Sequence, residues 1–498
     1  MPLIKNIRWV YILVFTFMAI NALCIYYENY YINLVPLALL VILLAVYSLD
    51  KLILFVVFLT PLAINLQHLE GGLGLSLPTE PIIFGIMLLF ILKQLHESTV
   101  DKAVMRHPIT ISIIVYLAWI FVTSITSEYP VVSIKFLISR LWYVLVFYFL
   151  GVQLFKEYKN IKRFIWLYVS AFVLVIFYTI YNHSLYGFEE TPANYVMSPF
   201  YNDHTVYGAM LAMFFPAIIF FTVNKKYSAI IKFSATLVLG IFVVALILSY
   251  TRAAWLSLAV AVVVFVILML RIKFNFILFF TVIIAILALT FQTDIKLSLE
   301  KNRQDASQDF DKHLQSISNI STDASNLERL NRWSAAFRMF EERPVFGWGP
   351  GTYQFVYAPF QQAQEKTIIS TNMGNRGNAH SEYLGPLSEA GVLGMLTFIA
   401  IIICVLATGF RLFYSIKENE MKKLVLVLLL GFVTYIVHGV LNNFLDTDKA
   451  SVPFWGFIAM FVAIDLYHRK LQTSEMMLKG DPDNADAVSS KLVDLHAE

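Results

Sequence analysis

Runs of about twenty apolar residues recur along almost the whole chain, and no other feature of the sequence restricts its fold as strongly. In a helix, twenty residues cross the ~30 Å hydrocarbon core of a bilayer. Of the 498 residues, 58% are hydrophobic and 14% are charged, whereas soluble domains carry about 25% charged residues. The sequence therefore predicts an all-α polytopic membrane protein with about 12–14 transmembrane helices and one large polar loop containing short helices.

Fourteen apolar runs are candidate membrane spans. They cover residues 9–27, 31–49, 52–67, 81–95, 109–126, 136–155, 163–181, 204–223, 231–250, 253–270, 274–291, 386–413, 424–445 and 451–467. The runs at 52–67 and 81–95 are short enough to be half-helices. The two cysteines, Cys24 and Cys404, each lie inside an apolar run, so neither a disulfide framework nor a cysteine metal site is predicted.

Basic residues gather in alternate connections between these runs. They are Lys5, Arg8, Lys93, Lys102, Arg106, Lys156, Lys159, Lys162, Arg163, Lys225, Lys226, Arg271, Lys273, Lys417, Lys422, Lys423, Arg469 and Lys470. By the positive-inside rule these connections are cytoplasmic, and so are both termini. The connections near 67–80, 182–203 and 446–450 are then predicted to share the opposite face with the large polar loop.

The same pattern divides the chain into four parts. About eleven spans in residues 1–292 precede the polar loop at 293–385, and about three more spans follow in residues 386–470. The polar tail, 471–498, is predicted to be cytoplasmic and disordered. A membrane protein that keeps one large polar loop is expected to carry out its chemistry there, at the membrane surface.

Two short helices and a tight turn are predicted within the loop. Residues 326–342 read as an amphipathic helix that ends before a proline. Its apolar residues at helical spacing are Leu330, Trp333, Phe337 and Phe340. Residues 347–351 contain too much glycine and proline for regular structure and predict a tight turn. A second short helix is predicted over residues 381–389.

Three arginines are candidate anion-binding residues. Arg252 lies where one predicted span ends and the next begins, while Arg329 and Arg332 lie on neighbouring faces of the predicted loop helix. A planar guanidinium binds phosphate oxygens in a bidentate manner that lysine cannot reproduce. The alternative is that Arg252 is an interfacial residue that caps a hairpin and that the other two are solvated surface residues.

His380 is the candidate general base, because a neutral imidazole near pH 7 can take a proton from an attacking hydroxyl. We expect Glu382 to orient its ring, with Asn378 and His204 in supporting positions. An ordinary loop histidine is the alternative interpretation. His438 is a weaker candidate for the same chemistry.

No metal or other cofactor is predicted. The outer connections contain no HExxH motif, no carboxylate cluster and no phosphate-binding lysine loop. The substrate must therefore arrive already activated. Glu389 is interpreted as a surface charge at the end of a helix.

Four segments, in order, resemble motifs of the bacterial O-antigen ligase / O-antigen polymerase superfamily. They are 249–256 (SYTRAAWL), Arg329 to Trp333 with 343–353 (RPVFGWGPGTY), 378–384 (NAHSEYL) and 388–394 (SEAGVLG). The helix start at 201–208 is a looser match, and the clear resemblance covers about 245–400. Ser381 stands where asparagine is commoner in that family.

The resemblance implies an inverting glycosyltransferase of the bacterial inner membrane, with its large loop in the periplasm. It would transfer a glycan from undecaprenyl diphosphate to an acceptor hydroxyl, most simply by O-antigen ligation to lipid A-core. Arg252 and Arg329 match family arginines that hold the pyrophosphate, and His380 matches the histidine that activates the acceptor. Gly349 and Gly351 belong to the matching glycine-rich turn. The implied partners are the lipid-linked donor, the acceptor and the lipid bilayer, without nucleic acid.

Two alternatives remain open. A polysaccharide polymerase or a protein O-oligosaccharyltransferase of the same superfamily would share the chemistry and differ in the acceptor. A polysaccharide transporter would need charged residues lining a path through its spans. The predicted spans are poor in charge, with Lys135 and Arg140 as the main exceptions.

Overall fold

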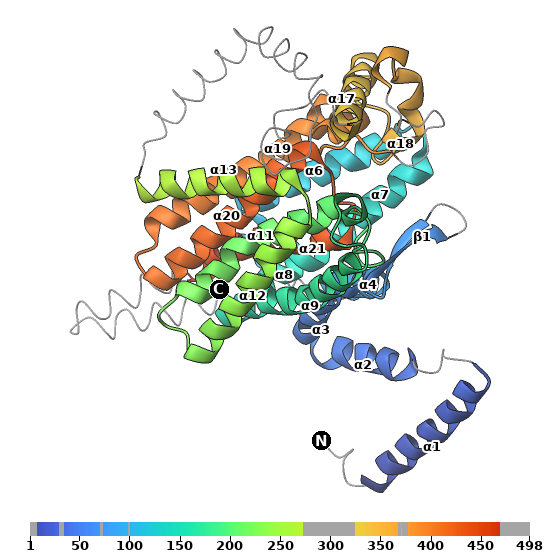
Figure 1. The fold of residues 1–498 in the computed structure, drawn as a ribbon, viewed down its shortest axis with the longest axis vertical. Coiled ribbons are helices and arrows are strands. Elements are labelled where there is room, and N and C mark those ends of the chain that lie inside the picture. Colours follow the sequence, from blue (N-terminus) through green and yellow to red (C-terminus); the bar gives the residue numbers. More distant parts are fainter. Residues whose placement is uncertain are drawn as a thin grey trace. The chain divides into compact units, whose positions relative to one another are not determined.

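The structure is a computed structural model that describes residues 7–28, 34–69, 73–97, 100–271, 324–366, 370 and 377–468. The described chain is almost entirely helical (Figure 1), and ten of its helices are long and apolar enough to cross a membrane. The all-α polytopic fold class is therefore confirmed. The predicted span at 274–291 and the predicted tail at 471–498 lie outside the described residues.

The chain forms two units, Met1–Val56 and Val57–Glu498. Helices α1 (Ile7–Tyr26) and α2 (Leu34–Tyr47) belong to the first unit, and α3 (Leu49–Leu59) begins in it. The second unit contains all the candidate site residues, so its internal packing decides the geometry of the site.

The helices of the second unit fall into long and short segments. The long ones are α4 (Thr79–His96), α6 (Pro108–Ile125), α7 (Pro130–Tyr143), α9 (Tyr158–Ser184), α11 (His204–Val223), α12 (Ala229–Leu248), α13 (Arg252–Met269), α17 (Ala324–Glu342), α19 (Leu384–Ser415), α20 (Asn419–Leu441) and α21 (Asp448–Ala463). The short ones are α5 (Lys102–Met105), α8 (Gly151–Leu154), α10 (Glu190–Ala193) and α18 (Tyr353–Val356), the 3-10 turns Thr60–Leu62, Ala358–Phe360 and Ala363–Glu365, and the π-helical segments Val144–Leu150 and Ile464–His468.

The predicted run at 52–67 is wrong in its second half. Helix α3 stops at Leu59, where Pro61 lacks the N–H that an α-helix needs, and a 3-10 turn follows. The chain then forms a two-stranded antiparallel hairpin from β1 (Ile64–Leu69) and β2 (Leu73–Leu77), with Ile64 opposite Leu77. The remaining helix is only 11 residues long, which agrees with a half-helix.

The two ends of the second unit differ in the connections that they carry. At one end, the backbone N–H of Glu128 donates to Trp348 O (3.0 Å) and that of Glu382 donates to Gly439 O (2.8 Å). At the other end, Lys162 Nζ lies 2.5 Å from Glu420 Oε1. Connections predicted to share a face therefore do meet, whereas the side on which the periplasm lies stays a prediction.

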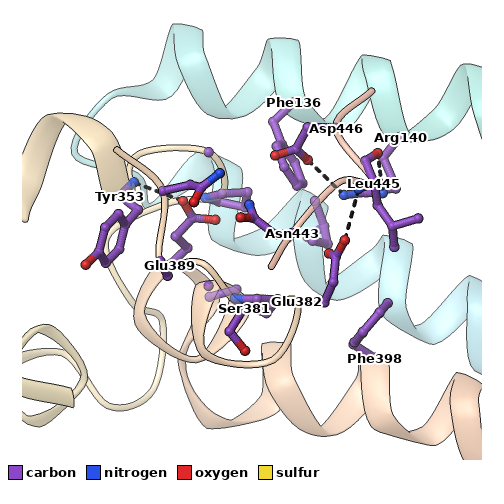
Figure 2. A pocket seen from close by; sticks show the side chains of 18 of the residues that line it. Phe136, Arg140, Tyr353, Ser381, Glu382, Glu389, Phe398, Asn443, Leu445 and Asp446 are labelled. Atoms are coloured by element: carbon purple, nitrogen blue, oxygen red, sulfur yellow. Dashed lines mark hydrogen bonds and ion pairs between the residues drawn. The ribbon is translucent and has the colours of Figure 1, made fainter. Parts of the chain in front are cut away.

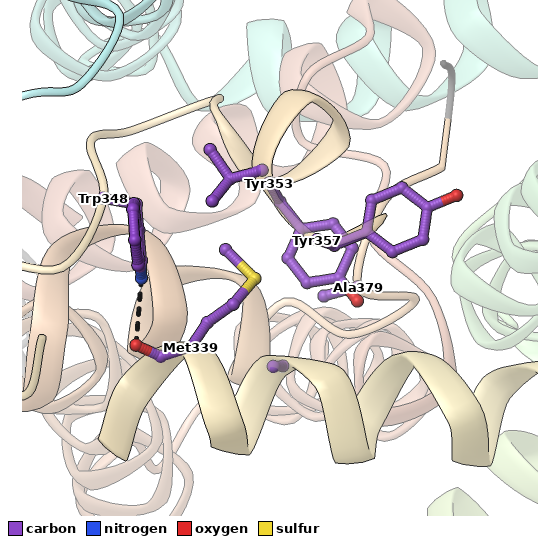
Figure 3. Close-up of a cluster of buried hydrophobic side chains, with 7 residues drawn as sticks. Met339, Trp348, Tyr353, Tyr357 and Ala379 are labelled. Carbon is purple, nitrogen blue, oxygen red and sulfur yellow. Dashed lines mark hydrogen bonds between the residues drawn. The ribbon is translucent and has the colours of Figure 1, made fainter. Parts of the chain in front are cut away.

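Helix α17 confirms the predicted amphipathic helix, but it buries a different face. Leu330 and Phe337 are 41% and 47% exposed. The helix instead buries small residues and Met339 in a hydrophobic cluster with the turn and helix that follow it (Figure 3). That cluster consists of Ala336, Met339, Trp348, Tyr353, Val356, Tyr357 and Ala379. Alanines allow close approach of the chain that carries the site, and this requirement overrides the larger apolar stripe.

Candidate active site

A break in α19 anchors the glycine-rich turn at 347–351. Gly391 has φ 69° and ψ −171°, so the helix is interrupted there. The backbone N–H of Val392, which a continuous helix would direct to Ser388 O, donates to Pro344 O instead (3.0 Å). Ser388 O then accepts from Trp348 N (3.2 Å). The end of the broken helix and the turn therefore form one rigid backbone assembly.

Gly349 and Gly351 are part of this assembly, and Gly351 also lines a cavity described below. Gly349 has φ 115°, and a Cβ there would lie 1.9 Å from Ser127 Oγ. Its N–H donates to Glu389 O (2.7 Å). Ser133 Oγ donates to Pro350 O (2.9 Å) and ties the turn to α7. The glycines thus belong to a turn that is fixed to α7 and α19, and their supporting role at the site stays a prediction.

Arg332 is held inside the protein. Its side chain is 6% exposed, Nε donates to Glu328 Oε1 (2.8 Å), and Nη1 donates to Asn378 O (3.2 Å). The guanidinium also lies over the ring of Tyr357, 4.9 Å from its centroid. In this arrangement Arg332 supports the loop that carries His380, and direct contact of its guanidinium with a diphosphate stays a prediction.

The loop at 377–383 holds His380 in an uncommon backbone conformation. His380 has φ 47°, in the left-handed region that few non-glycine residues adopt. Its N–H donates to Asn378 Oδ1 (3.0 Å), which closes a local turn. On the other side, Ser381 Oγ accepts from Tyr383 N and Leu384 N (both 3.3 Å) at the start of α19. Such a conformation costs about 1–3 kcal/mol and persists where the surroundings fix it.

The environment of His380 keeps its imidazole neutral. The side chain retains partial contact with solvent, yet burial, together with the positive charges of Arg332 and Arg329, lowers the pKa of His380 to about 4. The negative charges of Asp203 and Glu328 oppose this effect only in part. A neutral imidazole close to two guanidinium groups can accept a proton without first losing one.

Arg252 and His204 are brought together by two helix starts. Asp203 caps α11 by accepting from Thr205 N (2.7 Å), and Thr251, before α13, donates from Oγ1 to His204 O (2.8 Å). Gly208 permits this contact, because a Cβ there would lie 2.7 Å from Thr251. The tight hairpin predicted around Arg252 is present, since α12 ends at Leu248 and α13 begins at Arg252.

Electrostatic interactions link His380 and side chains from helices α11, α13, α17 and α20. The charge of Arg329 acts on the imidazoles of His204, His380 and His438, and that of Arg252 acts on His204. His438 is 1% exposed, and within the described residues neither of its ring nitrogens has a hydrogen-bond partner. Arg252 and Arg329 thus approach the same histidine, while their joint binding of one diphosphate stays a prediction.

Glu382 does not orient His380 in the way that the sequence suggested. Its Oε1 accepts hydrogen bonds from Tyr435 Oη (2.9 Å), Phe444 N (2.6 Å) and Leu445 N (3.0 Å). Burial, followed by the negative charge of Asp446, raises the pKa of Glu382 to about 7. The carboxyl group fixes the 378–382 loop to the end of α20, so it acts on His380 through the backbone.

A cavity of about 200 Å³ lies beside the 378–382 loop (Figure 2). Its polar lining includes Arg140, Glu382, Glu389, Asn443 and Asp446. The neighbours of His380 in the loop, Ala379 and Ser381, also line it, whereas His380 does not. The loop that carries His380 therefore forms part of the wall of this cavity.

Two residues of this cavity, Glu389 and Arg140, are not among the site residues that the sequence predicts. Glu389 is not a surface charge: it lines the cavity, and its Oε1 accepts from Tyr353 N (2.9 Å). Arg140, 5% exposed, donates from Nη1 to Leu445 O (2.9 Å) and from Nη2 to Asp446 Oδ1 (3.2 Å). An ionisable residue inside an apolar span indicates a functional position, so the sequence alone could have pointed to Arg140.

Among the described residues, no three His, Cys, Asp or Glu side chains lie close enough together to hold a metal ion. Of the charges that act on His380, those of Arg332 and Arg329 have larger effects than those of Asp203 and Glu328.

Two comparisons with known proteins agree with the motifs. Residues 235–399 match the family model described as O-antigen ligase, and this segment contains Arg252, Arg329, His380 and Glu389. A protein of Haemophilus influenzae described as uncharacterized is 24% identical over 247 residues, which are 49% of this chain and 59% of that relative. The chain thus covers less than two thirds of the relative's length.

Proposed function

We propose that this chain, which belongs to the O-antigen ligase superfamily, transfers a glycan from undecaprenyl diphosphate to an acceptor hydroxyl and acts as an O-antigen ligase on lipid A-core. The observation that carries the proposal is the position of His380. The loop holds it with φ 47°, and the positive charges of Arg332 and Arg329, which suit an anionic leaving group, act on it.

In this mechanism His380 is the general base. It takes the proton of the acceptor hydroxyl as the oxygen attacks the anomeric carbon of the donor glycan. The new bond from carbon to oxygen forms as the bond to the diphosphate oxygen breaks, and the electron pair of that bond leaves with the diphosphate. Attack from the side opposite the leaving group inverts the anomeric carbon.

Arg252 and Arg329 stabilise the leaving group. The negative charge on the diphosphate grows in the transition state, and preorganised cations in a site shielded from water stabilise it most. Arg332 holds the loop through Glu328 and the carbonyl of Asn378. Because the guanidinium groups supply the charge, we expect transfer to persist in excess EDTA.

The proposal includes an orientation in the membrane. The end that carries His380 faces the periplasm, where both the lipid-linked donor and the acceptor would be available, and the basic connections face the cytoplasm.

The test is transfer by the purified full-length protein in lipid nanodiscs, with lipid A-core and an undecaprenyl-diphosphate-linked O-unit oligosaccharide. We expect His380→Ala to lower the rate by about 10²–10⁴-fold, the usual effect of losing a general base. His96→Ala is the matched control, because that imidazole is exposed at the end of α4, away from the site. A His380→Ala protein with more than half of the wild-type rate would overturn the mechanism.

The products separate ligation from the related activities. One defined product on lipid A-core supports the proposed ligase. A ladder of repeats without lipid A-core would identify a polymerase, and glycosylation of an added protein acceptor would identify a protein oligosaccharyltransferase. Either of these results would overturn the assignment of the acceptor while leaving the chemistry of His380 in place.

A further inference from the structure

The size of the cavity beside the 378–382 loop limits what it can hold. Its volume is about 200 Å³, whereas a cavity of about 150 Å³ suffices for one benzene ring. The space therefore suits one six-membered ring that carries several substituents. The cavity is partly open, so the rest of a longer glycan would extend out of it.

The lining of the cavity selects a polar, hydroxylated ring. Glu382, Glu389 and Asp446 contribute carboxyl groups, and in the view of Figure 2 Asn443 lies between Glu382 and Glu389. Asn443 Oδ1 is buried and has no hydrogen-bond partner among the described residues, so it offers an acceptor to a ligand hydroxyl.

The charged groups that line the cavity do not suit a diphosphate. Three carboxyl groups line the cavity against one guanidinium, that of Arg140, which already donates to Leu445 O and Asp446 Oδ1. The cavity offers a phosphate little positive charge, whereas hydroxyl groups of a ligand can exchange hydrogen bonds with carboxyl groups in either protonation state. The rings of Tyr116 and Phe398 add flat apolar faces for the C–H groups of a sugar.

The position of the cavity indicates which sugar it holds. The cavity adjoins the loop that carries His380, since Asn378, Ala379 and Ser381 line it, and the charges of Arg332 and Arg329 act on that histidine. An inverting displacement requires the nucleophile and the leaving group on opposite sides of the reacting carbon. We infer that the cavity binds one sugar ring of the acceptor, the ring that carries or adjoins the attacking hydroxyl. This inference rests on the proposed function.

Gly385 offers a way to fill the cavity without disturbing its walls. It is a buried residue in the first turn of α19 and lines the cavity, yet a Cβ built on it would meet no atom within 4 Å. A leucine there would project into the void and would also favour the helix. Gly240 is the matched control, since it lies in α12 with equally open surroundings but is exposed.

The experiment measures acceptor binding apart from transfer. The probe is core oligosaccharide freed of lipid A, added without donor to the full-length protein in nanodiscs and followed by saturation-transfer NMR. We expect Gly385→Leu to abolish the signal and Gly240→Leu to preserve it. In transfer assays Gly385→Leu should raise the acceptor KM about 10-fold or more and leave the donor KM unchanged, because it removes binding rather than chemistry. Asn443→Leu, which removes one hydrogen-bonding group, should raise the acceptor KM about 3- to 10-fold.

Each outcome bears on the inference. Normal binding and turnover by Gly385→Leu would overturn it, and so would a rise in the donor KM alone. If the wild type binds the oligosaccharide, Gly385→Leu does not, and no transfer occurs in either, then the sugar site stands and the proposed function falls.

Discussion

At the scale of the residue, His380 combines a positive φ with a pKa lowered to about 4. A base whose pKa is depressed is already neutral at every pH above that value, and it loses its function only as the pH falls through it. The value of kcat/KM reports the ionisation of the free enzyme. We therefore expect it to be constant between about pH 5.5 and 8 and to fall below about pH 4.5. Half-maximal kcat/KM near pH 6.5, the usual value for an exposed histidine, would contradict this environment.

Arg252 and Arg329 are predicted to act together. Lysine keeps the charge but loses the bidentate fork, so Arg252→Lys and Arg329→Lys should each lower kcat/KM by about 10²-fold or more. The double variant should be little worse than either single one, as for residues that act as a unit. The control is Arg163→Lys. Arg163 lies near the start of α9, and its described hydrogen bond is to Asn160 within the same helix. Fully additive losses would show that the two arginines do not bind one group.

The sequence predicts the local position of a residue better than a role that depends on packing, and the roles of His380 and Arg252 stay predictions. Motif and spacing picked out His380 and placed Arg252 at a tight hairpin. The partners of Glu382 come from the end of α20, more than fifty residues away, so the sequence alone could not show that Glu382 anchors the loop rather than the imidazole. The sequence likewise could not show that Asn443 and Glu389 line one cavity, since only the fold brings them together.

At the scale of the element, the interruption of α19 at Gly391 supports the site. A Cβ at Gly391 would lie 2.1 Å from Val345 O, and its φ is 69°. Gly391→Ala should therefore destabilise the protein by about 2–4 kcal/mol and release the 347–351 turn. Thermal melting in detergent, beside transfer activity, measures this effect. The control, Gly240→Ala, is expected to melt at or slightly above the wild-type temperature. A wild-type melting temperature for Gly391→Ala would show that the break in α19 does not require glycine.

The elements differ in how well the sequence predicted them. Long apolar runs gave helices close to the expected bounds, since the length of a span is set by the bilayer. Helix α17 was found by its period, but its buried face was not, because Ala336 and Met339 face a cluster formed by distant residues. The hairpin of β1 and β2 was missed, as its apolar residues continue the run of α3 and only Pro61 marks the change.

At the scale of the whole molecule, the alternation of basic connections was informative because it depends on charge counts rather than on contacts. It predicted which connections would meet, and the structure joins 128 to 348, 382 to 439 and 251 to 204 at one end. It assigned the sides of the membrane only through the positive-inside rule, which acts during insertion and leaves no trace in packing.

The orientation can be measured by cysteine labelling in intact cells. In a variant with Cys24→Ala and Cys404→Ala, we expect a membrane-impermeant maleimide to label Glu189→Cys from outside and to label Lys417→Cys only after the membrane is permeabilised. Both positions are exposed, and they lie in connections at opposite ends of the second unit. The reverse pattern would place His380 on the cytoplasmic side. A donor already moved to the periplasm could not then reach it, and glycan transfer would have to draw on a cytoplasmic pool instead.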